Sequence, residues 1–349
     1  KAALLKLADL YETTRTQLAF DYLRKAIEVD PQYAIGLSTL GEMSYRKGFY
    51  PQAMESYEKY LALVNPTPKD YAQYATILYF NKQYTKTLEA IDKAPQDYIM
   101  ERLKMYCLYE LGNYAEAEVV GTKFMQNTPV KDIISKDYTS FARTLAKVKK
   151  YNEAAGNYEA AFKLDTTKLE YLSEAAKAFE RAKNYSKAIE NYQRVIVANP
   201  AHSMADIYTL GAAYYNGGLD TVSIKDKAMR KVYLLKADST FKSMSTKFPD
   251  HYLGYLSSAR TNSALDPETT QGLAKPYYEK ALEVMLPSQA ERKSEILECY
   301  RYLGYYHYVK NELAQSKVYW TKVLEIEPTD SISLQVIKSI DSSLKKGKQ

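Results

Sequence analysis

The chain has 349 residues, of which 46% are hydrophobic and 26% charged, with only 13 Gly and 12 Pro. These proportions suit a helical globular protein and exclude a collagen-like, low-complexity or wholly disordered chain. The 48 Lys and Arg residues outnumber the 42 Asp and Glu residues by only six. That excess is smaller than a dedicated nucleic-acid-binding domain requires, so no nucleic-acid partner is expected.

Tyrosine is the most unusual feature of the composition, with 35 Tyr against 9 Phe and a single Trp. The two cysteines, Cys107 and Cys299, are far apart, so neither a disulfide framework nor a metal site is expected. No stretch approaches the length of apolar residues that crosses a membrane. The first residue is Lys1 rather than methionine, so any initiator or signal segment is expected to be missing from this chain.

Small and aromatic residues recur along about 330 residues with a period near 34. The pattern is clearest in the middle of the chain, where Ala142, Tyr151, Ala154 and Tyr158 are each followed by a residue of the same type 34 positions later. In chain order the predicted repeats lie near 1–33, 34–67, 68–97, 98–134, 135–168, 169–203, 204–251, 252–296 and 297–330. The segment 331–349 is predicted to form a capping helix and tail, with Ile332, Val336, Ile337, Ile340 and Leu344 on one face.

This pattern resembles the tetratricopeptide repeat, a unit of two helices whose small residues allow close packing. The resemblance implies an all-α, right-handed α-solenoid in which residues 1–330 form one continuous stack. It also implies that the first helix of each repeat lies on a concave wall. Tetratricopeptide arrays mostly act as scaffolds for protein interactions.

Two repeats depart from the pattern. The seventh contains about 14 extra residues, and we expect a turn at Gly217 and Gly218 followed by a lengthened second helix from about Ser223. The eighth has a longer loop between its helices, with Pro267, Gly272 and Pro276. Each insertion is interpreted either as a specificity element or as a tolerated surface elaboration.

Carrying the family geometry over to this sequence places tyrosines and basic residues on the concave wall. Tyrosine fills the twelfth position of six repeats, at Tyr11, Tyr45, Tyr79, Tyr109, Tyr215 and Tyr308, and Lys136 lies among the basic residues. The candidate binding residues are Arg102, Tyr106, Tyr109, Arg143, Lys147, Lys177, Tyr208, Tyr215, Arg260, Arg301, Tyr302, Tyr305 and Tyr308. The alternative for each tyrosine is helix packing, and for each cation a solvated helix surface.

The function that these features favour is a non-enzymatic protein-interaction scaffold with a basic, tyrosine-rich groove. Its expected partner is a protein or peptide, including an acidic one. Two alternatives stay open: a carbohydrate-binding envelope protein, since tyrosine faces stack on sugars, and an RNA-binding repeat protein. The subgroup that clamps the C-terminal carboxylate of chaperones carries Asn at the ninth and sixth positions of adjacent repeats. No repeat here does, so that ligand is not expected.

Catalytic groups are sparse. His202, His251 and His307 fall in different repeats without metal-ligand spacing, and His307 occupies a position that is normally a packing site. Nucleotide-binding and nucleophile-elbow motifs do not occur, so neither an enzyme nor a cofactor is expected. The missing start and the low cysteine content favour an exported bacterial protein over a cytoplasmic one.

Overall fold

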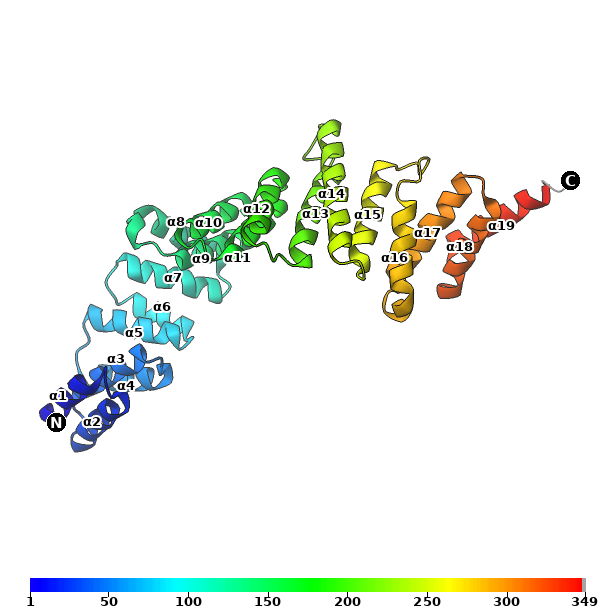
Figure 1. The fold of residues 1–349 in the computed structure, drawn as a ribbon. Helices are drawn as coiled ribbons and strands as arrows, with labels where there is room; N and C mark the ends of the chain where they lie inside the picture. The colour runs from blue at the N-terminus through cyan, green and yellow to red at the C-terminus, as the bar shows by residue number, and fades with distance from the viewer. Residues whose placement is uncertain (347–349) are drawn as a thin grey trace. The chain divides into compact units, whose positions relative to one another are not determined.

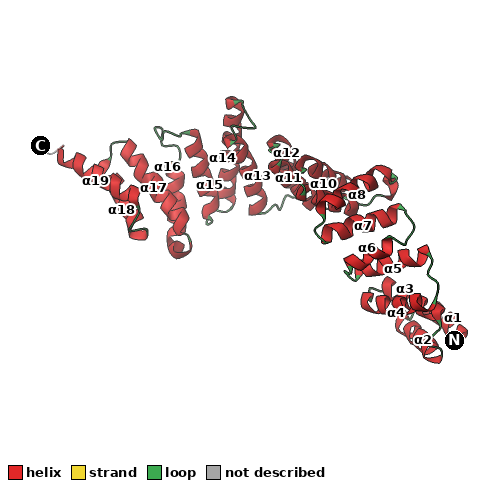
Figure 2. Ribbon diagram, turned by 180° about the vertical axis from the view of Figure 1, so that it is seen from behind, coloured by secondary structure: helices red, strands yellow, loops and turns green. Residues whose placement is uncertain are grey.

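The computed structural model describes residues 1–346, and every regular element in that range is helical. Nineteen α-helices and two short 3₁₀ segments follow one another, and these residues contain no strand. Each α-helix packs mainly against its neighbours in sequence, forming successive hairpins (Figures 1 and 2). The predicted all-α helical-repeat fold is confirmed. The chain groups into two compact units, Lys1–Thr166 and Thr167–Gln349.

The first unit contains five helical hairpins. The first helices of the second to fifth hairpins are α3, α5, α7 and α9. They begin at the residues where the second to fifth repeats are predicted to start. The elements are α1 (Ala2–Tyr11), α2 (Thr16–Val29), α3 (Ala34–Arg46), α4 (Tyr50–Leu63), α5 (Pro68–Phe80), α6 (Tyr84–Ile91), α7 (Tyr98–Glu110), α8 (Tyr114–Asn127), η1 (Val130–Asp132), α9 (Ser135–Lys147) and α10 (Tyr151–Leu164).

The second unit contains four hairpins and a final helix. In this unit the first helix of each hairpin begins at the predicted start of its repeat, except for α17, which begins at Lys293 rather than at 297. The elements are α11 (Leu169–Arg181), α12 (Tyr185–Ala198), α13 (Met204–Leu219), α14 (Lys227–Lys247), α15 (Tyr252–Leu265), α16 (Lys275–Met285), η2 (Leu286–Glu291), α17 (Lys293–Val309), α18 (Leu313–Ile326) and α19 (Ser331–Lys346).

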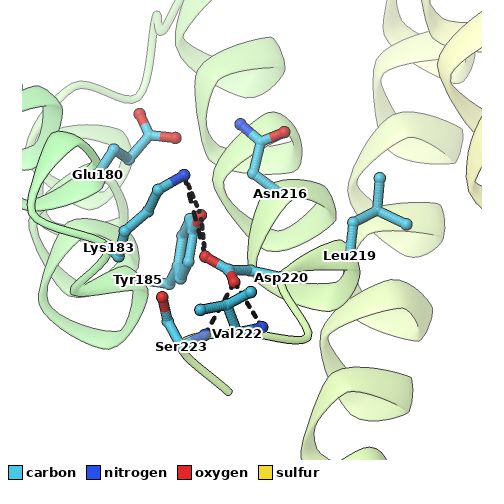
Figure 3. Close-up of a pocket in the computed structure, with 8 residues that line it drawn as sticks. All are labelled: Glu180, Lys183, Tyr185, Asn216, Leu219, Asp220, Val222 and Ser223. Carbon is cyan, nitrogen blue, oxygen red and sulfur yellow. Dashed lines mark hydrogen bonds and ion pairs between the residues drawn. The ribbon is translucent and has the colours of Figure 1, made fainter. Parts of the chain in front are cut away.

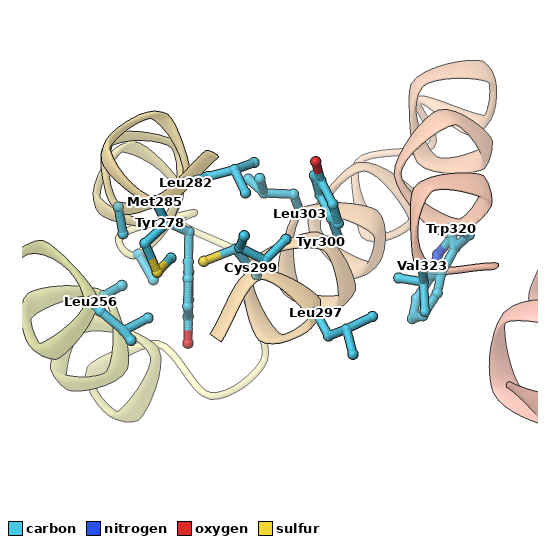
Figure 4. Close-up of a cluster of buried hydrophobic side chains, with 14 of the residues drawn as sticks. Leu256, Tyr278, Leu282, Met285, Leu297, Cys299, Tyr300, Leu303, Trp320 and Val323 are labelled. Carbon is cyan, nitrogen blue, oxygen red and sulfur yellow. The ribbon is translucent and has the colours of Figure 1, made fainter. Parts of the chain in front are cut away.

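Within several hairpins an aromatic side chain lies directly on a glycine of the partner helix. A Cβ atom added to Gly211 would lie 2.4 Å from Phe241, and one added to Gly304 would lie 2.9 Å from Trp320. Such close approach explains why the repeat pattern alternates small and aromatic residues. Trp320 belongs to the largest buried cluster of the second unit, together with Tyr278 and other side chains of α15 to α18 (Figure 4).

The turn between the two helices of a repeat uses a residue in the left-handed backbone region. Glycine fills this place at Gly48 (φ 80°) and Gly112 (φ 81°), whereas Lys82 (φ 59°), Lys149 (φ 65°) and Lys183 (φ 60°) fill it in other repeats. The amide that follows the residue donates back into the first helix each time, as in Gln83 N to Leu78 O at 2.9 Å. Lysine in this conformation carries a steric cost that glycine avoids.

Replacing Lys82 or Lys149 with glycine is therefore expected to raise the free energy of unfolding by about 0.5–1 kcal/mol, since relief of the steric cost exceeds the added chain entropy. Both side chains are exposed. Urea unfolding followed by circular dichroism measures the change, and Gly112→Lys, the reverse substitution in another repeat, should lower stability. A loss of stability in Lys82→Gly and Lys149→Gly would contradict this account of the turn.

The seventh repeat differs from the prediction in where its chain turns. Gly217 and Gly218 do not form a turn but lie buried inside α13, where added Cβ atoms would lie 2.7 Å from Tyr233 and 2.6 Å from Leu234. Packing against α14 overrides the tendency of paired glycines to turn. The turn follows, at residues 220–226, and α14 has 21 residues against 14 in α12. The predicted lengthening of the second helix is confirmed, although it begins at Lys227.

The long loop of the eighth repeat is ordered around Asp266. Its buried carboxylate accepts hydrogen bonds from the backbone amides of Gln271 (2.9 Å) and Gly272 (2.7 Å). Gly272 has a φ of 72° and lies against the ring of Tyr306 on α17. The loop is thus fixed to the neighbouring repeat.

The final helix, α19, covers the last hairpin with part of the predicted face. Ile340 is fully buried, and Val336 and Ile337 pack against the core of the second unit. Ile332 and Leu344 do not: they are 58% and 38% exposed, because they lie at the margins of the contact with α18. The continuous solenoid over 1–330 stays a prediction, and residues 347–349 of the predicted tail lie outside the described residues. Within residues 1–346, none of the helices combines the length and apolar character of a membrane span.

Candidate binding surfaces

Two of the candidate residues, Arg102 and Tyr106, are used inside the first unit. Arg102 Nε and Nη2 each donate to the carboxylate of Asp137 over 2.8 Å, and the Tyr106 hydroxyl donates to the same carboxylate. Asp137 is fully buried and Tyr106 is 5% exposed. Burial, followed by the bond to Asp137, raises the pKa of Tyr106 far above its ordinary value. In this structure both residues join α7 to α9 instead of facing solvent.

Beside this cluster, α9 presents an exposed row of cations. Lys136, Arg143 and Lys147 are spaced seven and four residues apart, which places them on one side of the helix. None has a carboxylate within ion-pair distance among the described residues. The only acidic residue of α9 is the buried Asp137.

Tyrosines of the neighbouring repeats lie under these cations. Lys136 Nζ is 5.3 Å from the ring centre of Tyr79 and 3.2 Å from its hydroxyl oxygen, and Lys147 Nζ is 5.4 Å from the ring centre of Tyr114. Tyr109 packs on Tyr114 with 5.5 Å between ring centres. We call Lys136, Arg143, Lys147 and the tyrosines Tyr79, Tyr109 and Tyr114 the α9 face. Five residues of the α9 face were predicted for the concave wall: Tyr79, Tyr109, Lys136, Arg143 and Lys147.

The candidate cations of the second unit have acidic partners. Arg260 donates to both carboxylate oxygens of Glu298, at 2.9 and 2.6 Å, and Arg301 donates to Asp330 at 2.8 Å and to Glu327. The bond to Glu298 raises the pKa of Arg260. Lys177 is exposed and pairs with Glu174, three residues earlier on α11, at 2.7 Å.

The tyrosine candidates of this unit divide into packed and exposed groups. Tyr208 and Tyr215 are half-buried beside the core, and Tyr302 stacks on Tyr278 with 4.4 Å between ring centres. Burial raises the pKa of Tyr302 to about 12. Tyr305 and Tyr308 are 45% and 42% exposed and, with Trp320, Gln335, Val336 and Ser339, line a cleft of about 310 Å³. This cleft is large enough for one apolar side chain or ring.

A larger pocket of about 690 Å³, which no sequence pattern indicates, lies at the base of the seventh-repeat insertion. Figure 3 shows Lys183 reaching toward Tyr185 and Asp220 across it. The Tyr185 hydroxyl donates to Asp220 at 3.1 Å, and Asp220 also accepts from the amides of Ser223 and Val222. These amide bonds, that of Ser223 foremost, lower the pKa of Asp220 to about 2. Asp220 therefore stays ionised at neutral pH and orders the turn.

Groups with catalytic potential are held in packed environments. Burial raises the pKa of the Cys107 and Cys299 thiols to about 12, so both stay protonated at neutral pH. His307 is 8% exposed, stacks on Tyr319 and hydrogen-bonds to Glu312, which confirms the predicted core position. Within residues 1–346, no group of three or more His, Cys, Asp or Glu side chains is placed to hold a metal ion.

These hairpins define a helical-repeat protein. A family model described as tetratricopeptide repeat matches residues 139–218. The C-terminal part of a TPR repeat-containing protein from Cytophaga hutchinsonii is 29% identical, with a TM-score of 0.57, over 76% of this chain and 99% of that one. Residues 139–218 therefore match the tetratricopeptide repeat, and similarity to a TPR repeat-containing protein extends over 76% of the chain.

A curated relative is more distant. A TPR repeat-containing protein of Methanocaldococcus jannaschii is 24% identical over 314 residues, which is 80% of this chain and 54% of the relative. The chain thus spans about half the length of that protein. Tetratricopeptide repeat proteins generally act as non-enzymatic scaffolds for protein or peptide partners, and this fold suggests such a role.

Proposed function

We propose that the chain is a non-enzymatic scaffold that binds an acidic segment of a partner protein on the α9 face. The observation that carries the proposal is that some basic residues of the candidate surfaces pair with a carboxylate of the protein and others do not. Arg102, Arg260 and Arg301 each have a carboxylate partner within the protein, whereas Lys136, Arg143 and Lys147 have no carboxylate within ion-pair distance among residues 1–346.

The tyrosines support binding in two ways. Each ring offers rigid contact area at a low cost in conformational entropy. Contacts between the lysine ammonium groups and the rings of Tyr79 and Tyr114 also restrict the cations before a ligand arrives. A partner carboxylate would therefore meet groups that are already positioned.

The spacing of the cations indicates the form of the segment. At 1.5 Å per helical residue, Lys136 and Arg143 lie about 10 Å apart along α9, and Arg143 and Lys147 about 6 Å. In an extended peptide successive side chains point to opposite sides, and residues two positions apart lie on one side about 6.6 Å from each other, which matches Arg143 and Lys147. A ligand of the form acid-x-acid, with a further acidic residue two or four positions away to reach Lys136, is the best fit.

The proposal is tested with a display library of random 15-residue peptides selected against the whole chain. Selected peptides should be enriched in Asp and Glu at this spacing. The double variant Arg143→Glu and Lys147→Glu should weaken their binding about 10-fold or more, and added salt should weaken it further. The control is the double variant Lys131→Glu and Lys163→Glu, which reverses two exposed cations that do not belong to the α9 face. Both pairs change the net charge equally.

Peptides without acidic enrichment, or equal binding by both variants, would overturn the proposal. A single-stranded RNA oligonucleotide and a glycan array serve as the alternative ligands. If no peptide is selected, and RNA or a glycan binds the chain but not the double variant Arg143→Glu and Lys147→Glu, the α9 face would be assigned to that ligand instead.

A further inference from the structure

The lengthened helix α14 has two apolar sides, of which only one is covered. Tyr233, Leu234, Ala237, Phe241 and Met244 are buried against the rest of the second unit. The hairpin end that α14 forms with α13 reaches beyond the neighbouring α15 (Figure 1).

The opposite side of α14 carries Ala228, Val232, Leu235 and Ser239, all exposed. Their spacing of four, three and four residues forms a single straight stripe. Val232 is 47% exposed, Leu235 51%, and Met229 at the margin 40%. An ordinary surface helix keeps this side polar, so the stripe is unusual for a helix that has already buried one apolar side.

The charges around the stripe are almost all positive. Helix α14 contains six basic residues and one acidic residue, Asp238. Asp238 is buried and already binds Lys242 and Asn262. Lys227 and Lys231, together with Lys225 in the preceding turn, are exposed and have no carboxylate within ion-pair distance among the described residues.

We propose that this side of α14, defined by Val232, Leu235 and Met229 with Lys225, Lys227 and Lys231, is a second docking surface for an acidic amphipathic helix of a partner protein. The twelve residues of the stripe, from Ala228 to Ser239, span about 16 Å, or three helical turns. A partner helix with apolar residues at matching intervals would cover the stripe, and Glu or Asp beside them would reach the lysines. The surface lies in the second unit, so it is separate from the α9 face.

A protein helix fits these observations better than a lipid surface. The exposed side chains are aliphatic and short, whereas helices that insert into a membrane interface typically present Trp, Phe and Leu over a longer face. The lysines also lie at fixed positions on a helix, so they can form ion pairs with a partner whose acidic residues match those positions.

The test uses the whole chain and a display library of 20-residue helical peptides with a fixed apolar stripe, flanked at random by Glu, Asp, Lys, Arg or Ser. Acidic helices should be selected. Their affinity, measured by fluorescence anisotropy, should fall about 10-fold or more in Val232→Ser with Leu235→Ser and in Lys227→Glu with Lys231→Glu. Val318→Ser, which changes an equally exposed valine on α18 (46% against 47% for Val232), should leave it unchanged.

Circular dichroism should confirm that each variant keeps its helical content. Arg143→Glu with Lys147→Glu should have no effect on these helices, which separates this proposal from the α9 face. Failure to select any acidic helix, or selection of helices whose binding survives the α14 variants, would overturn it. Vesicles of phosphatidylserine and phosphatidylcholine are the alternative ligand. If the chain binds these vesicles and the double variant Val232→Ser and Leu235→Ser does not, the stripe would be assigned to a membrane instead.

Discussion

Asp137→Ala is expected to lower the free energy of unfolding by about 3–5 kcal/mol, because it leaves a charged group without its partner in a buried site. Asp137 is fully buried and accepts hydrogen bonds from Arg102, Tyr106 and the backbone amide of Ile134. The Arg102 side chain is only 18% exposed, so water replaces little of the lost interaction. The substitution therefore disturbs the junction of α7, α9 and the segment that joins α8 to α9.

Urea unfolding followed by circular dichroism measures this loss. Asp226→Ala is the control, because Asp226 is an exposed aspartate that only caps α14 through the amide of Ala228, and it should cost about 1 kcal/mol. Removing the ion pair as a whole, in Arg102→Met with Asp137→Ala, should recover part of the stability. A cost for Asp137→Ala no larger than that of Asp226→Ala would show that the buried cluster does not hold the repeats together.

The chain is also expected to unfold cooperatively in alkali, between pH 10 and about 12. Burial raises the pKa of Tyr79 and Tyr302 to about 12 and raises that of Tyr57, Tyr192 and Tyr278 further. An unfolded tyrosine ionises near pH 10, so the unfolded chain loses protons first. The stability that these groups contribute is complete below pH 10 and is lost as the pH rises toward their folded values.

Tyrosinate absorbance and far-ultraviolet circular dichroism, recorded together, test this expectation. The part of the tyrosinate absorbance that comes from the buried tyrosines should form only as helix is lost. Tyr57→Phe, which keeps the buried ring, should move the loss of helix to higher pH, and Tyr305→Phe should leave it in place. Ionisation of nearly all tyrosines near pH 10 with the helices intact would contradict the buried positions found here.

The sequence was sufficient to predict the repeats because each hairpin needs the same contact. A small residue in the first helix and an aromatic residue in the second recur at Gly211 with Phe241 and at Gly304 with Trp320, and periodicity makes such pairs visible. Gly217 and Gly218 show the limit of this reasoning. Local preference indicated a turn, but the close approach of Tyr233 and Leu234 keeps both glycines inside a helix.

The candidate site was less predictable, because some of its ion pairs join residues about one repeat apart. The sequence pattern predicts Arg102 and Arg260 as groove cations, yet their acids lie 35 and 38 residues further on. No local pattern connects them. An acidic residue near the start of the following repeat, such as Asp137 or Glu298, is the signal that would have identified both pairs.

Packing of each helix on its sequence neighbours has a kinetic consequence. Contacts between residues close in the chain require little loop closure, and proteins dominated by such contacts fold fast for their size. In repeat arrays, ordering can start at any repeat and spread to the next, so stability is set by individual repeats and their interfaces. A chain built in this way tolerates the gain or loss of a repeat during evolution, because no distant pairing has to be rebuilt.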